Sequence, residues 1–280
     1  MSKVLAEEEY VEQAYLFRAL KERSNASEPV QDLMAYVKEE ILTTTKLPMA
    51  IGYLLSELNH VGTMSSAMER MAHYFTPMQT YLVAAAESDK GTFDMRSAFD
   101  ILAREAKFRS ESAPADAMFF FQFETICRNR LDYDSGLYAI AHDPIYNEDW
   151  QRWILKIRSQ IGLVALADLV YVHSERYLKQ ELSTGHEFEK PDPLLFNEKI
   201  GRIALANRTK QPLYFFSALQ RQMKYPEVVK PVRKSPDENA IPKLVTAVER
   251  LEARIKLLED EQRNQGIDLS QFYKKQDGPT

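Results

Sequence analysis

Glycine and cysteine are scarce in this sequence. Its 280 residues include nine glycines and a single cysteine, whereas glycine usually makes up about 7% of a protein. Few glycines allow few tight turns, which disfavours an all-β fold, and neither G-x-G-x-x-G nor G-x-x-x-x-G-K-[ST] occurs. Cys127 alone can form neither an internal disulfide nor a cysteine-based zinc site, which fits a reducing compartment.

Long apolar runs are also lacking. The start, MSKVLAEEEY, has three consecutive acids where a signal peptide would be apolar. The longest charge-poor stretch, residues 159–174, contains Asp168 and is shorter than the ~20 residues that span a bilayer. The net charge is −5, whereas a nucleic-acid binder needs a basic face. We therefore expect a cytoplasmic protein that binds neither membranes nor nucleic acid.

What the sequence does contain is helical periodicity. Apolar residues recur mostly at spacings of three and four, and no clean alternation extends beyond four residues. Helix formers, capping residues and breaks at proline or glycine predict helices over residues 3–23, 28–45, 49–60, 63–73, 78–87, 94–109, 114–131, 135–141, 149–159, 162–182, 194–207 and 211–223. The predicted fold class is all-α, with a multi-helix, bundle-like body.

The chain changes character at Tyr225, after which prolines are frequent: Pro226, Pro231, Pro236 and Pro242. Proline at this density is typical of an extended linker. The sequence therefore predicts a helical body over 1–224, a proline-rich linker over 225–240, a separate helix over 241–264 and a polar tail over 265–280.

The separate helix carries a heptad pattern. Its a positions are β-branched and its d positions are leucine, at spacings of 3, 4, 3, 4 and 3: Ile241, Leu244, Val248, Leu251, Ile255 and Leu258. This choice of residues favours a parallel two-stranded coiled coil, and hence a homodimer. Val245 and Leu257 widen the apolar face, which leaves a trimer, or a helix packed on its own body, as alternatives.

One short motif could bind metal. Glu57 and His60 form the only Glu-x-x-His of the chain, and residues at i and i+3 share one face of a helix. In this single motif the chain resembles the ferritin-like di-metal carboxylate proteins, which use two such motifs and two further glutamates. That resemblance implies Glu12 (or Glu9) and Glu124 as further ligands of iron or manganese. A structural role, with His60 complementing the dipole at a helix end, is the favoured interpretation, and the metal site is the alternative.

Asp168 lies among apolar neighbours of its predicted helix, and Glu175 falls on the same face seven residues later. With Tyr171 they could form acid–base machinery. A buried polar network that joins Asp168 to an arginine of another helix is the favoured interpretation, because an unpaired buried carboxylate is costly. Removing Asp168 would then cost about 3–5 kcal/mol.

A methionine stripe runs through Met64, Met68 and Met71 to Phe75. Such a stripe could line a site for an apolar ligand, but packing between helices produces the same spacing and is favoured. The sequence as a whole favours a non-enzymatic cytoplasmic interaction or scaffold protein that self-associates through residues 241–258, with no cofactor. The alternatives are a di-metal redox protein and a helical binder of an apolar ligand.

Overall fold

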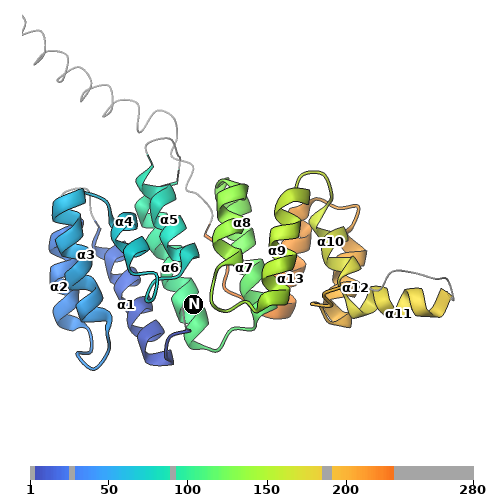
Figure 1. Ribbon diagram of the computed structural model, residues 1–280, viewed down its shortest axis with the longest axis horizontal. Helices are drawn as coiled ribbons and strands as arrows, with labels where there is room; N and C mark the ends of the chain where they lie inside the picture. The colour runs from blue at the N-terminus through green and yellow to red at the C-terminus, as the bar shows by residue number, and fades with distance from the viewer. Residues whose placement is uncertain (1–3, 25–28, 89–92, 185–190, 230–280) are drawn as a thin grey trace, which may run out of the picture. The chain divides into compact units, whose positions relative to one another are not determined.

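The computed structural model describes residues 4–24, 29–88, 93–184 and 191–229. Within these ranges the regular structure consists of thirteen helices and no named strand, so the predicted all-α class is confirmed (Figure 1). The helices are α1 (Glu7–Arg23), α2 (Val30–Glu40), α3 (Leu47–Val61), α4 (Met64–Arg70), α5 (Pro77–Glu87), α6 (Met95–Ser110), α7 (Ala115–Asn129), α8 (Tyr133–Ala141), α9 (Glu148–Gln160), α10 (Leu166–Val172), α11 (Glu175–Thr184), α12 (Glu198–Asn207) and α13 (Pro212–Met223).

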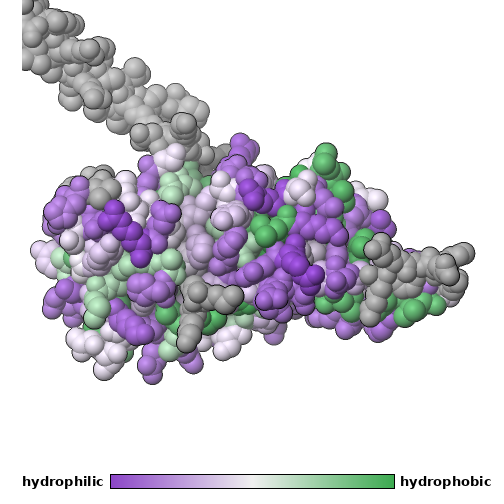
Figure 2. Space-filling view, viewed as in Figure 1, coloured by the Kyte–Doolittle hydropathy of each residue, from purple (hydrophilic) through white to green (hydrophobic). Residues whose placement is uncertain are grey.

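The surface mixes polar and apolar residues. Hydrophilic residues cover most of the face in Figure 2, and hydrophobic residues gather over the part built by α9 and α10. Leu155, Leu163 and Val164, from α9 and the turn that follows it, are among the exposed apolar side chains. None of the helices in the described ranges has the length and apolarity needed to cross a membrane.

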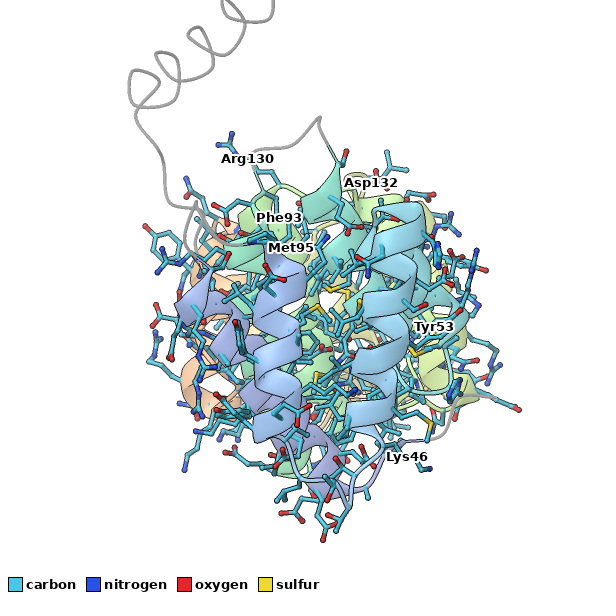
Figure 3. All side chains as sticks on the ribbon, turned by 90° about the vertical axis from the view of Figure 1, so that its left-hand side faces the viewer. Lys46, Tyr53, Phe93, Met95, Arg130 and Asp132 are labelled. Atoms are coloured by element: carbon cyan, nitrogen blue, oxygen red, sulfur yellow. The ribbon has the colours of Figure 1, made fainter. Side chains whose placement is uncertain are left out.

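Helices α1 to α6 pack around a core rich in methionine and aliphatic side chains. α1 lies along α6, α2 pairs with α3, and α4 packs on both α3 and α5. Figure 3 looks at the α2–α3 end and shows sulfur atoms between the helices. The methionine stripe Met64, Met68 and Met71 is buried in this core, as the packing interpretation of that stripe expects.

Helices α7 to α13 enclose the part of the same continuous core that is richest in aromatic rings. Phe119 of α7 is central to it, with its ring centroid 5.1 Å from that of Trp153 and 5.8 Å from that of Phe123. The ring of Phe196 lies 5.1 Å from Trp153 and 5.7 Å from Phe120. Edge-on and offset contacts of this kind add to the free energy gained by burying large rings. α5 packs on α8 and so brings a helix of each half together.

The predicted helix over 162–182 is two helices, because α10 ends at Val172 and α11 begins at Glu175. The hydroxyl of Ser174 donates to the carbonyl oxygen of Tyr171 at 2.6 Å and accepts from the amide of Tyr177 at 3.4 Å. Serine side chains compete with helical hydrogen bonds in this way and favour helix starts. A Cβ added to Gly201 of α12 would lie 2.3 Å from the Ser174 hydroxyl oxygen, so glycine permits this close approach.

The body also extends beyond the predicted boundary at residue 224. Tyr225 and Val228 are buried in the same core as α7 and α13. The side chain of Arg104 donates to the carbonyl oxygen of Glu227 at 2.8 Å, and that of Asn129 to Val229 at 3.2 Å. Proline spacing therefore placed the start of the linker too early, since buried side chains continue past Pro226. The predicted helix 241–264 and its six heptad residues lie outside the described residues.

Candidate functional site

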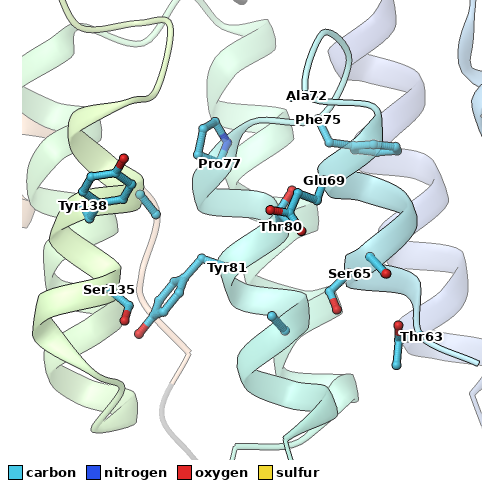
Figure 4. Close-up of a pocket in the computed structure, with 13 residues that line it drawn as sticks. Thr63, Ser65, Glu69, Ala72, Phe75, Pro77, Thr80, Tyr81, Ser135 and Tyr138 are labelled. Carbon is cyan, nitrogen blue, oxygen red and sulfur yellow. The ribbon is translucent and has the colours of Figure 1, made fainter. Parts of the chain in front are cut away.

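A groove lies between α4, α5 and α8, and is here called the α4/α5/α8 groove. Its volume is about 550 Å³, within the range of about 300–1,000 Å³ usual for ligand sites. Figure 4 shows α5 between the other two helices, with side chains from all three facing the hollow. The lining residues are Thr63, Ser65, Ser66, Glu69, Ala72, Phe75, Pro77, Thr80, Tyr81, Ala84, Ser135, Tyr138 and Ala139.

Helix α5, which forms the floor of the groove, is capped at its N-terminus by Thr76 and Gln79. The amide of Gln79 donates to the Thr76 hydroxyl at 3.3 Å, while the Gln79 side chain accepts from the Thr76 amide at 3.1 Å. Pro77 occupies the first turn, where its missing N–H costs nothing. The amide nitrogen of the Gln79 side chain also donates to Gln13 of α1 at 3.1 Å. This capping box therefore ties the groove floor to the core.

The wall helix α4 is held at its N-terminus by a carboxylate from the end of α5. Glu87 accepts from the amides of Met64 at 2.5 Å and Ser65 at 3.1 Å, and also from the Ser65 hydroxyl. A carboxylate at a helix N-terminus accepts hydrogen bonds from free N–H groups and interacts favourably with the positive end of the helix dipole. Glu87 thereby fixes one wall of the groove to its floor.

The opposite wall, α8, is fastened through Tyr81. Its hydroxyl donates to the carbonyl oxygen of Asp132, the N-cap of α8, at 2.7 Å. Burial raises the pKa of Tyr81, with a smaller contribution from Asp132, so this phenol stays protonated and donates. A Cβ on Gly136 would lie 3.3 Å from the Tyr81 ring and 2.6 Å from the Ile126 side chain. Glycine at this position lets α8 approach both α7 and α5 closely.

The charge of the groove is one-sided. Among the described residues that line it, Glu69 is the one formally charged side chain. Figure 4 shows Glu69 reaching from α4 toward Thr80 of α5. On the other wall, the guanidinium of Arg158 lies 5.3 Å from the centre of the Tyr138 ring, and its charge is balanced by Asp134 at 2.5 Å. The groove therefore offers a carboxylate, hydroxyl groups and an aromatic ring.

A second polar group, here called the Arg109 cluster, lies in the interior: Glu105, Arg109, Gln122, Asp143 and Tyr146. The side chains of Arg109, Glu105 and Asp143 are 2%, 1% and 0% exposed. Arg109 donates to Glu105 at 2.8 Å and to Oδ1 of Asp143 at 3.1 Å. Gln122 donates to Glu105 at 2.9 Å and accepts from Tyr146 at 2.7 Å.

The Arg109 cluster joins α6, α7 and the turn between α8 and α9. Burial would lower the pKa of Arg109, but Asp143 and Glu105 raise it well above its usual range. For Tyr146, burial raises the pKa of the phenol well above its usual range. These groups thus keep their protons, and the cluster acts as a cross-link between helices. Its i,i+4 pair, Glu105 and Arg109, is visible in the sequence, but Asp143 is 34 residues from Arg109.

The three glutamates of the alternative metal site have other partners. Glu57 of α3 accepts from Arg70 at 2.6 Å, and Glu12 of α1 accepts from the amide of Leu42 at 3.2 Å. Glu124 of α7 pairs with Arg128 and lies 2.6 Å from the Tyr225 hydroxyl. His60 is exposed in the last turn of α3. In the part of the chain that the structure describes, no three His, Cys, Asp or Glu side chains could share one metal ion.

Asp168 does pair with an arginine from elsewhere, Arg208, directly after α12. Its side chain is 30% exposed, however, so the pair lies at the surface and not in a buried network. Glu175 is exposed at the start of α11, where it accepts from the amide of Glu198 at 3.1 Å. Asp168 and Glu175 do not share one helical face, because the break at Ser174 places them on separate helices, α10 and α11.

The remaining candidate residues are part of the core. Burial raises the pKa of Cys127 to about 11, which fits the expectation of an unreactive thiol. Phe75, at the end of the methionine stripe, is buried and contributes to the groove floor. Sequence reasoning missed the groove itself, whose signal is the series of small residues Pro77, Thr80 and Ala84 on one face of α5.

No protein-family model matches this chain, and no match was found among curated proteins or solved structures.

Proposed function

We propose that this chain is a non-enzymatic interaction protein that pairs with a second copy of itself through residues 241–258. The observation that carries the proposal is the heptad pattern, in which every a position is β-branched and every d position is leucine. Burying one leucine side chain contributes about 1.5–3 kcal/mol. Three leucine layers and three β-branched layers would offset part of the entropy lost on association.

The last described residues of the chain pack on the body. The strap over residues 224–229 is fastened to α6 and α7 through Arg104, Asn129 and the buried Tyr225. The described body is therefore held in place as far as Val229. Two copies joined beyond it would present two bodies, each with its own α4/α5/α8 groove, which is an arrangement useful to a scaffold.

Light scattering on the full chain tests the pairing. We expect twice the mass of one chain for the parent and the mass of one chain for Leu251→Glu, because two carboxylates would meet at the centre of the seam. Leu257→Glu is the matched control, since position 257 lies off the a/d seam, and it should remain a dimer. Far-ultraviolet circular dichroism should show that all variants remain helical.

A shortened chain gives the complementary measurement. It should end at Pro231, where the compact unit ends, because ending at Tyr225 would remove Val228 and the Arg104 and Asn129 contacts. We expect this shortened chain to be a monomer. A parent with the mass of one chain, or a shortened chain that remains a dimer, would refute pairing through the heptads.

A further inference from the structure

We propose that the α4/α5/α8 groove binds a basic side chain, lysine or arginine, carried by an extended segment of a partner protein. This site is independent of the heptads, because every residue that lines it lies between Thr63 and Ala139. Three observations on the groove define its occupant: its charge, its hydroxyl groups and its length.

The charge of the groove favours a cation. Glu69 is exposed, and within the described residues its carboxylate has no recorded hydrogen bond or ion pair. It also lies in the last turn of α4, where the helix dipole is negative and disfavours an acid. A cationic group bound here would pair with the Glu69 carboxylate and would offset its unfavourable interaction with the helix dipole. No lysine, arginine or histidine is among the described lining residues, so the cation must come from a ligand.

The hydroxyl groups suit a polypeptide backbone. Thr63, Ser66 and Tyr138 line the groove, and no hydrogen bond of their hydroxyls is recorded within the described part of the chain. Tyr138 is 51% exposed, so its hydroxyl is accessible to a ligand. Hydroxyl groups both donate and accept. They can therefore pair with the N–H and C=O groups that an extended segment exposes on either side of its basic residue.

The length of the groove matches a short extended segment. Pro77 and Ala84 line the floor seven residues apart on α5, which is about 10 Å at ~1.5 Å per residue. An extended chain rises ~3.3 Å per residue, so about three residues span that distance. The central residue of the three would place its side chain near Glu69.

Random seven-residue peptides displayed on phage and selected on the full chain provide the test. The selected peptides are then synthesised, and their affinities are measured by calorimetry for the parent and three variants. Glu69→Gln removes the charge. Ala84→Trp fills the groove from an exposed position of α5. Glu111→Gln, at an exposed carboxylate after α6, is the matched control for net charge.

We expect selected peptides to share a lysine or arginine. Their affinity should fall about two- to fivefold in Glu69→Gln, as for an accessible ion pair, and by a similar factor when citrulline replaces arginine in the peptide. Ala84→Trp should abolish binding, and Glu111→Gln should leave it unchanged. Leu251→Glu should bind the same peptides per chain whether or not the parent is a dimer, so the outcome is separate from that of pairing.

Two results would overturn the proposal. Selected peptides that lack a basic residue, or that bind Glu69→Gln and the parent equally, would show that the groove does not recognise a cation. Peptides that bind Ala84→Trp as tightly as the parent would place their site outside the groove.

Discussion

The Arg109 cluster and the α4/α5/α8 groove both contain carboxylates, but the surroundings of those carboxylates are opposite. In the cluster, Glu105 and Asp143 are almost fully buried and share one guanidinium. In the groove, Glu69 is exposed, with no partner recorded among the described residues. Interior charges thus cross-link the fold, whereas the proposal above gives the groove charge a role in binding. Removing the first should cost stability, and removing the second should cost binding.

The largest effect is expected for Arg109→Met. This substitution leaves two buried carboxylates without their cation, which should reduce the free energy of unfolding by about 3–5 kcal/mol. Arg109→Lys keeps the charge but loses the forked geometry that reaches both carboxylates, and so should cost less. Urea denaturation followed by circular dichroism gives both values. A loss below about 1 kcal/mol in Arg109→Met would show that the cluster is not a cross-link.

A smaller effect is expected for Tyr225→Phe. The Tyr225 hydroxyl lies 2.6 Å from Glu124 and 3.1 Å from the carbonyl oxygen of Phe216. Hydrogen bonds to charged groups contribute about 1.5–3 kcal/mol, and the same denaturation experiment should show a loss of this order. Tyr214→Phe is the matched control, because Tyr214 is 62% exposed, and it should unfold like the parent. Equal midpoints for both variants would contradict the fastening of the strap.

The ion pair of Asp168 and Arg208 is expected to make a smaller contribution to stability than either of the two groups above. Both side chains are partly exposed, at 30% and 45%, and exposed pairs contribute about 0.2–1 kcal/mol. A double-mutant cycle with Asp168→Ala and Arg208→Ala should give a coupling energy in that range. A loss of about 3–5 kcal/mol in Asp168→Ala alone would instead support the buried network that the sequence predicts.

The helical fold could be predicted because its signals are local. Gly62 ends α3 with a φ of 81°, as a glycine after the last helical turn predicts. Proline at the first turn likewise marks the start of α5. The break at Ser174 was missed, since its cause includes the packing of Phe196 and Gly201 from a later segment.

The sites could not be predicted in the same way, because they join distant segments. Tyr81 and Asp132 are 51 residues apart, and Arg109 and Asp143 are 34 apart. Only the i,i+4 half of the Arg109 cluster leaves a pattern in the sequence. The alternative metal site illustrates the converse, since a motif such as Glu57 with His60 does not specify that Arg70, from the next helix, pairs with the carboxylate.

The smallest effect on stability is expected at Glu69. Helix α4 has a carboxylate near each end: Glu87 of α5 at its N-terminus and its own Glu69 in the last turn. Glu87 accepts from two backbone amides at the N-terminus, so Glu87→Gln weakens a cap and should cost about 1 kcal/mol. Glu69 lies in the last turn, where an acid opposes the dipole, so Glu69→Gln should stabilise the protein by about 0.3 kcal/mol. Thermal unfolding of the two variants in parallel should therefore shift the midpoint in opposite directions, and high salt should reduce the shift of Glu69→Gln. If Glu69→Gln were instead as destabilising as Glu87→Gln, Glu69 would be a structural residue. Its carboxylate would then not be available to bind a cationic side chain in the groove.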